Sequence, residues 1–131
     1  MIILHLLLAT PYALYSFAVD GGAVSTITPA TNCTLPAKAV MVSSTVDVTT
    51  AITSGGAPNI AVGTTGTGGT TGDILAAALK ASYSAGIKSG LITFAAPLKI
   101  TTSGTITVTV TTAVLTAGVM DIWVQYYVAT N

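Results

Sequence analysis

The chain has 131 residues, the usual size of one domain, and a chain of this size buries about two thirds of the surface that its unfolded form exposes, so one hydrophobic core is enough. Four lysines and four aspartates, with no arginine and no glutamate, make up 6% of the residues and cancel to zero net charge, which argues against a nucleic-acid partner. Because so little charge keeps two copies apart, the composition predicts that other subunits cover much of the surface.

The chain opens with an apolar segment, "MIILHLLLATPYALYSFA" at 1–18, which resembles a signal peptide but lacks the charged residues at its start. Pro11 interrupts the apolar run, which is too short for a membrane span of ~20 residues and gives no reason to expect a membrane partner. We interpret 1–12 as an apolar arm or edge strand that packs on a neighbouring subunit or on its own sheet, and 13–131 as a single β-sandwich domain. The arm supplies three candidate interface residues: Ile2, Ile3 and Leu6.

His5 is the only histidine and Cys33 the only cysteine. A lone cysteine excludes an intrachain disulfide framework and a thiolate zinc site, and a lone histidine excludes the paired histidines of metalloproteases. We expect His5 to be a core or interface histidine. The sequence therefore predicts no metal site.

Many short β-strands separated by glycine-containing turns follow along the chain. We expect strands at about 1–8, 13–19, 23–28, 38–48, 58–62, 90–94, 97–102, 105–111 and 119–129. The 24 threonines suit such strands, because a β-branched side chain packs well on a pleated sheet while its hydroxyl faces water. This pattern predicts an all-β fold, an antiparallel, jelly-roll-like β-sandwich.

One short helix is expected at 73–83, "DILAAALKASY", with Asp73 as its N-cap and an apolar stripe that includes Ile74 and Ala78. The glycine-rich stretch before it, at 63–72, resembles a phosphate-binding loop. It lacks the lysine of a P-loop and an acidic residue about 20 positions further on, so we interpret it as a surface loop and predict no cofactor.

Catalytic residues are not apparent either. No two of the four aspartates lie within 25 residues of each other, so only the fold could create a carboxylate pair, and the sequence indicates none. The abundant serines and threonines have no credible base to activate them. We predict that the protein is not an enzyme.

The C-terminal stretch "TITVTVTTAVLTAGVMDIWVQYYV", 105–128, alternates strictly in two parts. Side chains of a strand point alternately to its two faces, which predicts inward rows of Ile106, Val108, Val110, Ile122, Val124, Tyr126 and Val128. The opposite row holds Asp121, Trp123, Gln125 and Tyr127, a mixture typical of a contact surface. We expect the two strands to be antiparallel neighbours or close companions, with Trp123 and Tyr127 at a subunit contact.

Three blocks, "YSFAVDGGAVSTITP", "LPAKAVMVSSTVDVTTAITSGGAPNIAVGT" and "APLKITTSGTITVTVTTAVLTAGVMDIWVQYYV", together resemble a family of small β-rich virion structural proteins of tailed bacteriophages, which includes head-decoration proteins. The resemblance covers roughly 15–128 and implies a non-enzymatic capsid decoration or cement protein on the outer head surface. The implied partners are the major capsid protein and further copies of the chain, and we expect a homotrimer. No site residues follow from the resemblance.

Two other classes of protein remain open. The chain could be a subunit of another assembly, such as a phage tail or an extracellular filament joined by strand donation. It could also be a carbohydrate-binding or hydrolytic β-sandwich, although one Trp, five Tyr and two Phe offer few aromatic platforms for a sugar.

Overall fold

The structure is a computed structural model in which residues 9–130 are described. The predicted strand at 1–8, with Ile2, Ile3, His5 and Leu6, therefore lies outside the described residues. In chain order the elements are β1 (Tyr12–Ser16), α1 (Phe17–Asp20), β2 (Thr26–Ile27), β3 (Ala39–Thr53), β4 (Asn59–Thr64), β5 (Leu75–Leu79), the 3-10 helix η1 (Lys80–Tyr83), β6 (Gly86–Ser89), β7 (Leu98–Lys99), β8 (Ile106–Thr111) and β9 (Ala117–Val128).

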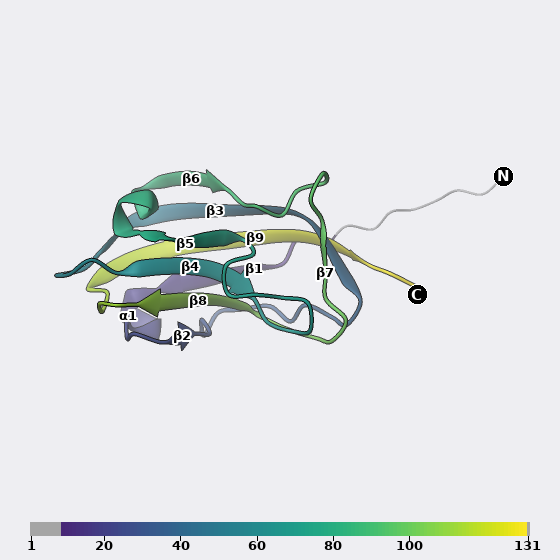
Figure 1. The fold of residues 1–131 in the computed structure, drawn as a ribbon, viewed down its shortest axis with the longest axis horizontal. Helices are drawn as coiled ribbons and strands as arrows, with labels where there is room; N and C mark the ends of the chain where they lie inside the picture. The colour runs from purple at the N-terminus through teal and green to yellow at the C-terminus, as the bar shows by residue number, and fades with distance from the viewer. Residues whose placement is uncertain (1–8, 131) are drawn as a thin grey trace.

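The strands form two antiparallel sheets whose strands run along the long axis of the molecule (Figure 1). One sheet has the order β1-β9-β3-β6, with β7 as a fifth strand that also pairs with β3, and the other has the order β2-β8-β4-β5. The antiparallel pairs are nested along the chain: β1 with β9, β2 with β8, β3 with β6 and β4 with β5. A long hairpin wound over two sheets in this way is a jelly roll, so the predicted all-β, jelly-roll-like sandwich is confirmed.

The hydrophobic core lies between the sheets, and the inward rows predicted for β8 and β9 contribute to it. Five residues of these rows are at most 1% exposed: Ile106, Val108, Val110, Ile122 and Val124. Tyr126 is partly buried against the same core. Val128, however, is 50% exposed, and the prediction is wrong there. Val128 is the last residue of β9 and lies opposite Ala39, the first residue of β3.

β8 and β9 lie in different sheets. The segment 112–116 between them therefore carries the chain from one layer of the sandwich to the other. Of the two arrangements expected for these strands, the structure shows companions across the core and not hydrogen-bonded neighbours. β9 pairs instead with β1 and β3.

The predicted helix at 73–83 is wrong. Residues 75–79 form β5, which pairs with β4 through Leu79 opposite Asn59 and Ala78 opposite Ile60, and the chain turns helically only at η1. Alanine and leucine favour a helix locally, but this preference is weak, and pairing satisfies the backbone groups along one edge of β4. The short α-helix of the described chain is α1, in a region where we expected a strand at 13–19.

Two further strand predictions differ from the structure. The segment 90–94 contains no named strand, and β6 at Gly86–Ser89 pairs with β3 in its place. Of the strand expected at 97–102, only Leu98–Lys99 pairs with β3 as β7. β6 and β7 both pair with the long strand β3, on the edge that β9 does not occupy.

Candidate interaction surface

The outer face of the five-stranded sheet carries the residues that the sequence placed at a contact. The outward row of β9 is Asp121, Trp123, Gln125 and Tyr127, as expected from the alternation of the strand. Trp123 is 42% exposed, which is high for so large an apolar side chain in the middle of a sheet, and Tyr127 is partly buried. No partner chain is present, so the role of Trp123 and Tyr127 as contact residues stays a prediction.

An aromatic pair stands on this outer face. The register places Tyr12 of β1 directly opposite Trp123 of β9, and the two ring centroids lie 5.0 Å apart at a tilt of 33°. Tyr12 is 44% exposed. Large aromatic side chains of this kind are the usual anchors of protein interfaces. The sequence does not identify Tyr12 as a surface aromatic beside Trp123. The two residues come from strands at opposite ends of the chain, and no local pattern of residues indicates that these strands pair.

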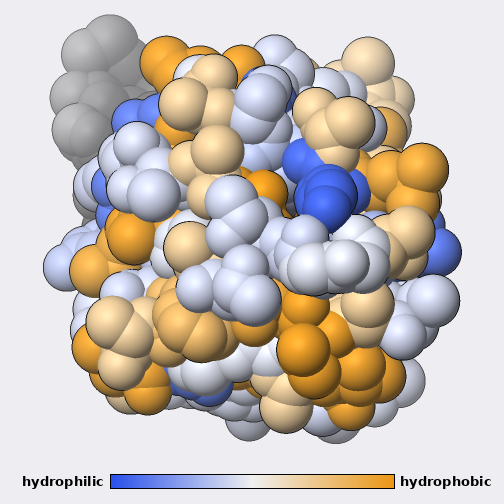
Figure 2. All heavy atoms as spheres, turned by 90° about the vertical axis from the view of Figure 1, so that its left-hand side faces the viewer, coloured by the Kyte–Doolittle hydropathy of each residue, from blue (hydrophilic) through white to orange (hydrophobic). Residues whose placement is uncertain are grey.

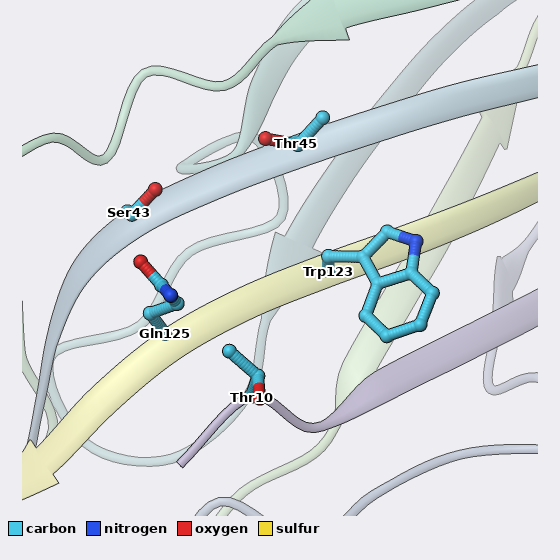
Figure 3. A pocket seen from close by; sticks show the side chains of 5 residues that line it. All are labelled: Thr10, Ser43, Thr45, Trp123 and Gln125. Atoms are coloured by element: carbon cyan, nitrogen blue, oxygen red, sulfur yellow. The ribbon is translucent and has the colours of Figure 1, made fainter. Parts of the chain in front are cut away.

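Beside Trp123 the sheet is hollowed into a shallow depression of about 350 Å³, lined by Thr10, Ser43, Thr45, Trp123 and Gln125 (Figure 3). Figure 3 shows the indole ring at one side of the depression and the small polar side chains around it, contributed by β3, β9 and the segment before β1. Hydroxyl and amide groups both donate and accept hydrogen bonds. The depression therefore suits a polar group of a partner, and the described residues that line it include no acid or base.

The fold also creates a carboxylate pair that the sequence did not indicate. Asp47 of β3 lies directly opposite Asp121 of β9 in the antiparallel register, so both side chains are on the outer face. Both residues are partly buried. We expected that only the fold could create such a pair, and strand pairing does so here by joining residues that are far apart in the sequence.

Shifted pKa values occur at buried groups elsewhere in the described chain. Burial, helped by the charge of Asp20, raises the pKa of the Tyr15 hydroxyl to about 12, and burial also raises the pKa values of Cys33, Asp73 and Tyr83. None of these four groups lines the depression beside Trp123. Within residues 9–130 no three His, Cys, Asp or Glu side chains gather in a way that could hold a metal ion, and no helix there is long and apolar enough to cross a membrane.

The glycine-rich loop between β4 and β5 folds onto the four-stranded sheet. A Cβ atom on Gly63 would overlap the backbone of Thr70 and Thr71, which shows how closely the loop approaches β4. The Asp73 carboxylate accepts hydrogen bonds from the Thr64 hydroxyl at 2.7 Å and the Thr70 amide at 2.9 Å. Asp73 therefore holds the loop against the end of β4, and its predicted role as a helix N-cap is wrong.

No protein-family model matches this chain, and no curated protein matches its sequence. Solved structures do match its fold. A chain from the capsid of Ralstonia phage GP4 is 18% identical with a TM-score of 0.60, and the match covers 94% of this chain and 86% of that one.

Two further structures match in the same way. A chain from the acid-stable capsid of Helicobacter pylori bacteriophage KHP30 is 15% identical with a TM-score of 0.64, over 95% of this chain and 90% of that one. A chain from the capsid asymmetric unit of cyanophage Pam1 is 18% identical with a TM-score of 0.58, over 93% of this chain and 85% of that one. The jelly roll described above is thus a fold that also occurs in chains of three phage capsids.

Proposed function

We propose that this chain is a non-enzymatic virion structural protein, a decoration or cement protein that binds the outer surface of a phage head and stabilises the shell. The observation that carries the proposal is the fold shared, over nearly the whole chain, with chains of three phage capsids. The weakly charged composition supports it, because such a surface favours association with other subunits.

The outer face of the five-stranded sheet is the proposed contact with the major capsid protein. Trp123 and Tyr127 lie on it, with Tyr12 beside Trp123. The opposite outer face is less suitable, because the loop before Asp73 lies over part of it and leaves Thr107 only 1% exposed. An exposed aromatic residue on this face would anchor the contact by apolar burial, at ~25 cal/mol per Å² before association costs.

A homotrimer is the proposed oligomer, and one end of the sandwich supports it. Figure 2 looks onto this end, to which α1 and the β8–β9 connection belong, and apolar groups are prominent on it. Val19, Val24 and Val114 are 71%, 51% and 56% exposed. The Leu115 amide donates a 2.8 Å hydrogen bond to the Gly22 carbonyl, so the segments that carry Val24 and Val114 are adjacent. Burial of these valines between copies around a threefold axis would close a ring.

The N-terminal arm, residues 1–12 with Ile2, Ile3 and Leu6, is proposed to pack on a neighbouring copy or on its own sheet. The described part of the arm starts beside β9, where Ala9 and Tyr126 exchange two backbone hydrogen bonds of 3.0 and 3.1 Å. An apolar segment that continues from this point has β9 and its surroundings within reach. If a chain without residues 1–8 forms the same oligomer and binds heads equally well, the arm has no such role.

The function is tested by adding the purified chain to phage heads that lack it. We expect saturable binding in a fixed ratio to the shell protein, a higher temperature of head disruption, and density for the chain at threefold positions on the outer surface in cryo-electron microscopy. Light scattering of the free protein should give the mass of a trimer. Absence of binding to the heads would overturn the proposed function, and a monomer at micromolar concentration would overturn the trimer.

A second candidate is a subunit of another assembly joined by strand donation. It is favoured by β5, an edge strand of sequence "LAAAL" without charge or proline, which is the kind of edge that accepts an added strand. A helical rod assembled from the purified chain alone would support this candidate, whereas a closed shell decorated with separate trimers would exclude it.

A further inference from the structure

The pair formed by Asp47 and Asp121 is unusual because no side chain within residues 9–130 compensates either carboxylate. In directly opposite positions of an antiparallel pair the Cα atoms are ~4.5–5.5 Å apart, and like charges placed there destabilise the sheet. Neither carboxylate makes a side-chain hydrogen bond or an ion pair with another residue between 9 and 130. The carboxylates of the other two aspartates are hydrogen-bonded within the chain. Asp20 accepts hydrogen bonds from two backbone amides, and Asp73 accepts one from the Thr64 hydroxyl.

The neighbours of this pair in the row across the sheet do not compensate it. The register across the sheet places Leu14 of β1 beside Asp121, and Ile87 of β6 beside Asp47, so the two acids are the centre of a row with an apolar residue at each end. Leu14 is partly buried and Ile87 is 74% exposed. Both flanking side chains are apolar, so neither of them offers a cation or a hydrogen bond to the carboxylates.

The next row across the sheet also suits a cationic side chain. It holds Tyr12, Trp123 and Thr45, and successive residues on one face of a strand are ~7 Å apart, so the indole ring lies within reach of a side chain that ends at the carboxylates. Aromatic faces attract cations, and the apolar stem of Lys or Arg packs well on them. An anion would be repelled from this position.

From these two rows we propose that the outer face of the five-stranded sheet binds a basic side chain, Arg or Lys, of the shell protein, with its cation between Asp47 and Asp121 and its stem against Trp123. This inference rests on the proposed function and specifies the chemistry of its partner. On assembly, the cation would replace the repulsion between the two carboxylates with an attraction to each of them. The repulsion would then be present in the free protein and relieved in the bound state.

A second copy offers few cations for this site, so we place the cation on the shell protein. The chain has four lysines and no arginine. Lys80 donates to the carbonyl oxygens of Ser54 and Gly56, at 2.7 and 2.9 Å, and Lys88 donates to the Ser84 hydroxyl at 3.3 Å. These two lysines are therefore engaged within their own subunit.

The test compares Asp47→Asn and Asp121→Asn with wild type in two assays, thermal unfolding of the free protein and binding to heads that lack it. Each variant removes one charge with little change in shape. The thermal midpoint should stay equal or rise because the repulsion is gone, while the affinity for heads should fall about tenfold and lose part of its dependence on salt. Loss of thermal stability in both variants, or unchanged affinity for heads, would overturn the inference.

Asp20→Asn is the matched control, since it changes the net charge by the same amount. Its carboxylate accepts the Ser16 and Ala30 amides at 2.9 and 2.8 Å, so this variant should lose stability and keep its affinity for heads. The same assays distinguish failure of the cation site from failure of the proposed function. If wild type binds heads and Trp123→Ala weakens binding but neither Asp47→Asn nor Asp121→Asn does, the cation site is wrong and the proposed function stands. If wild type does not bind heads, the proposed function fails. Reduced trimer mass with normal binding to heads would assign the cation to a second copy and overturn the inference.

Discussion

The hydroxyl of Tyr83 donates a 2.8 Å hydrogen bond to the backbone carbonyl of Ile60, and both residues are at most 1% exposed. The bond connects η1 to β4 beneath the edge strand β5. It lies in a region that sequence propensity assigned to a helix. Burial raises the pKa of the Tyr83 hydroxyl, so the group stays a neutral donor over the physiological range.

Tyr83→Phe should lower the free energy of unfolding by about 1 kcal/mol, because it removes the donor and leaves a buried carbonyl with one partner fewer. Urea denaturation monitored by circular dichroism measures the loss. Tyr12→Phe is the control, since the exposed Tyr12 hydroxyl makes no hydrogen bond within residues 9–130. Equal stability of the two variants would show that the Tyr83 bond contributes nothing.

Gly63→Ala should destabilise the protein by about 2 kcal/mol or more, because the added methyl group overlaps the backbone of the loop at Thr70 and Thr71 and a backbone segment has to move. Gly55→Ala is the matched control. A Cβ atom there meets nothing within 4 Å, so stability should be unchanged or rise by up to ~1 kcal/mol. A Gly63→Ala protein with the stability of wild type would mean that the loop does not pack on β4 in solution.

Acidification should stabilise the protein through Asp73. Burial raises the pKa of this carboxyl above its ordinary value of 3.8, and its Oδ1 atom is buried without a partner among the described residues. A carboxyl with a higher pKa in the folded state binds its proton more tightly there, so its contribution is fully present below the unfolded pKa and is lost as pH rises through the folded pKa.

Thermal unfolding between pH 7 and pH 4 tests the direction of this change in stability. The difference in stability between wild type and Asp73→Asn should shift in favour of wild type as the pH falls, because the amide does not titrate. A shift in the opposite direction would contradict a raised pKa for Asp73.

Val108→Asp should abolish folding. Val108 is fully buried in β8, and an aspartate there would place an unpaired charge in the apolar core. The expected result is a chain without the β-sheet signal in circular dichroism. A soluble, folded Val108→Asp protein would contradict the inward orientation of this row.

Trp123→Ala should leave the domain folded and weaken binding to heads by about 1 kcal/mol or more, as for an interface anchor. Phe94→Ala is a control of similar size, because Phe94 is 67% exposed in the β6–β7 connection and belongs to neither of the two central rows of the outer face. If the Trp123→Ala protein binds heads normally and has a native unfolding transition, Trp123 is not a contact residue.

The sequence alone determined the class of fold and the inward faces of its clearest strands. Alternation is a local property, since the side chains of any extended segment point to opposite sides, and the threonine and valine rows of 105–111 therefore predicted both the strand and its buried face. The glycine turns and short strands likewise led to a jelly-roll-like sandwich, and the structure has that topology.

The tertiary structure decided which segments pair, and with that the composition of the candidate surface. Residues 75–79 became a strand because an edge of β4 was open to them, although their own preference is helical. Tyr12 meets Trp123, and Asp47 meets Asp121, through pairings between strands that are far apart in the chain. Which strands meet depends on how the two sheets enclose one core, and no local pattern of residues carries that information.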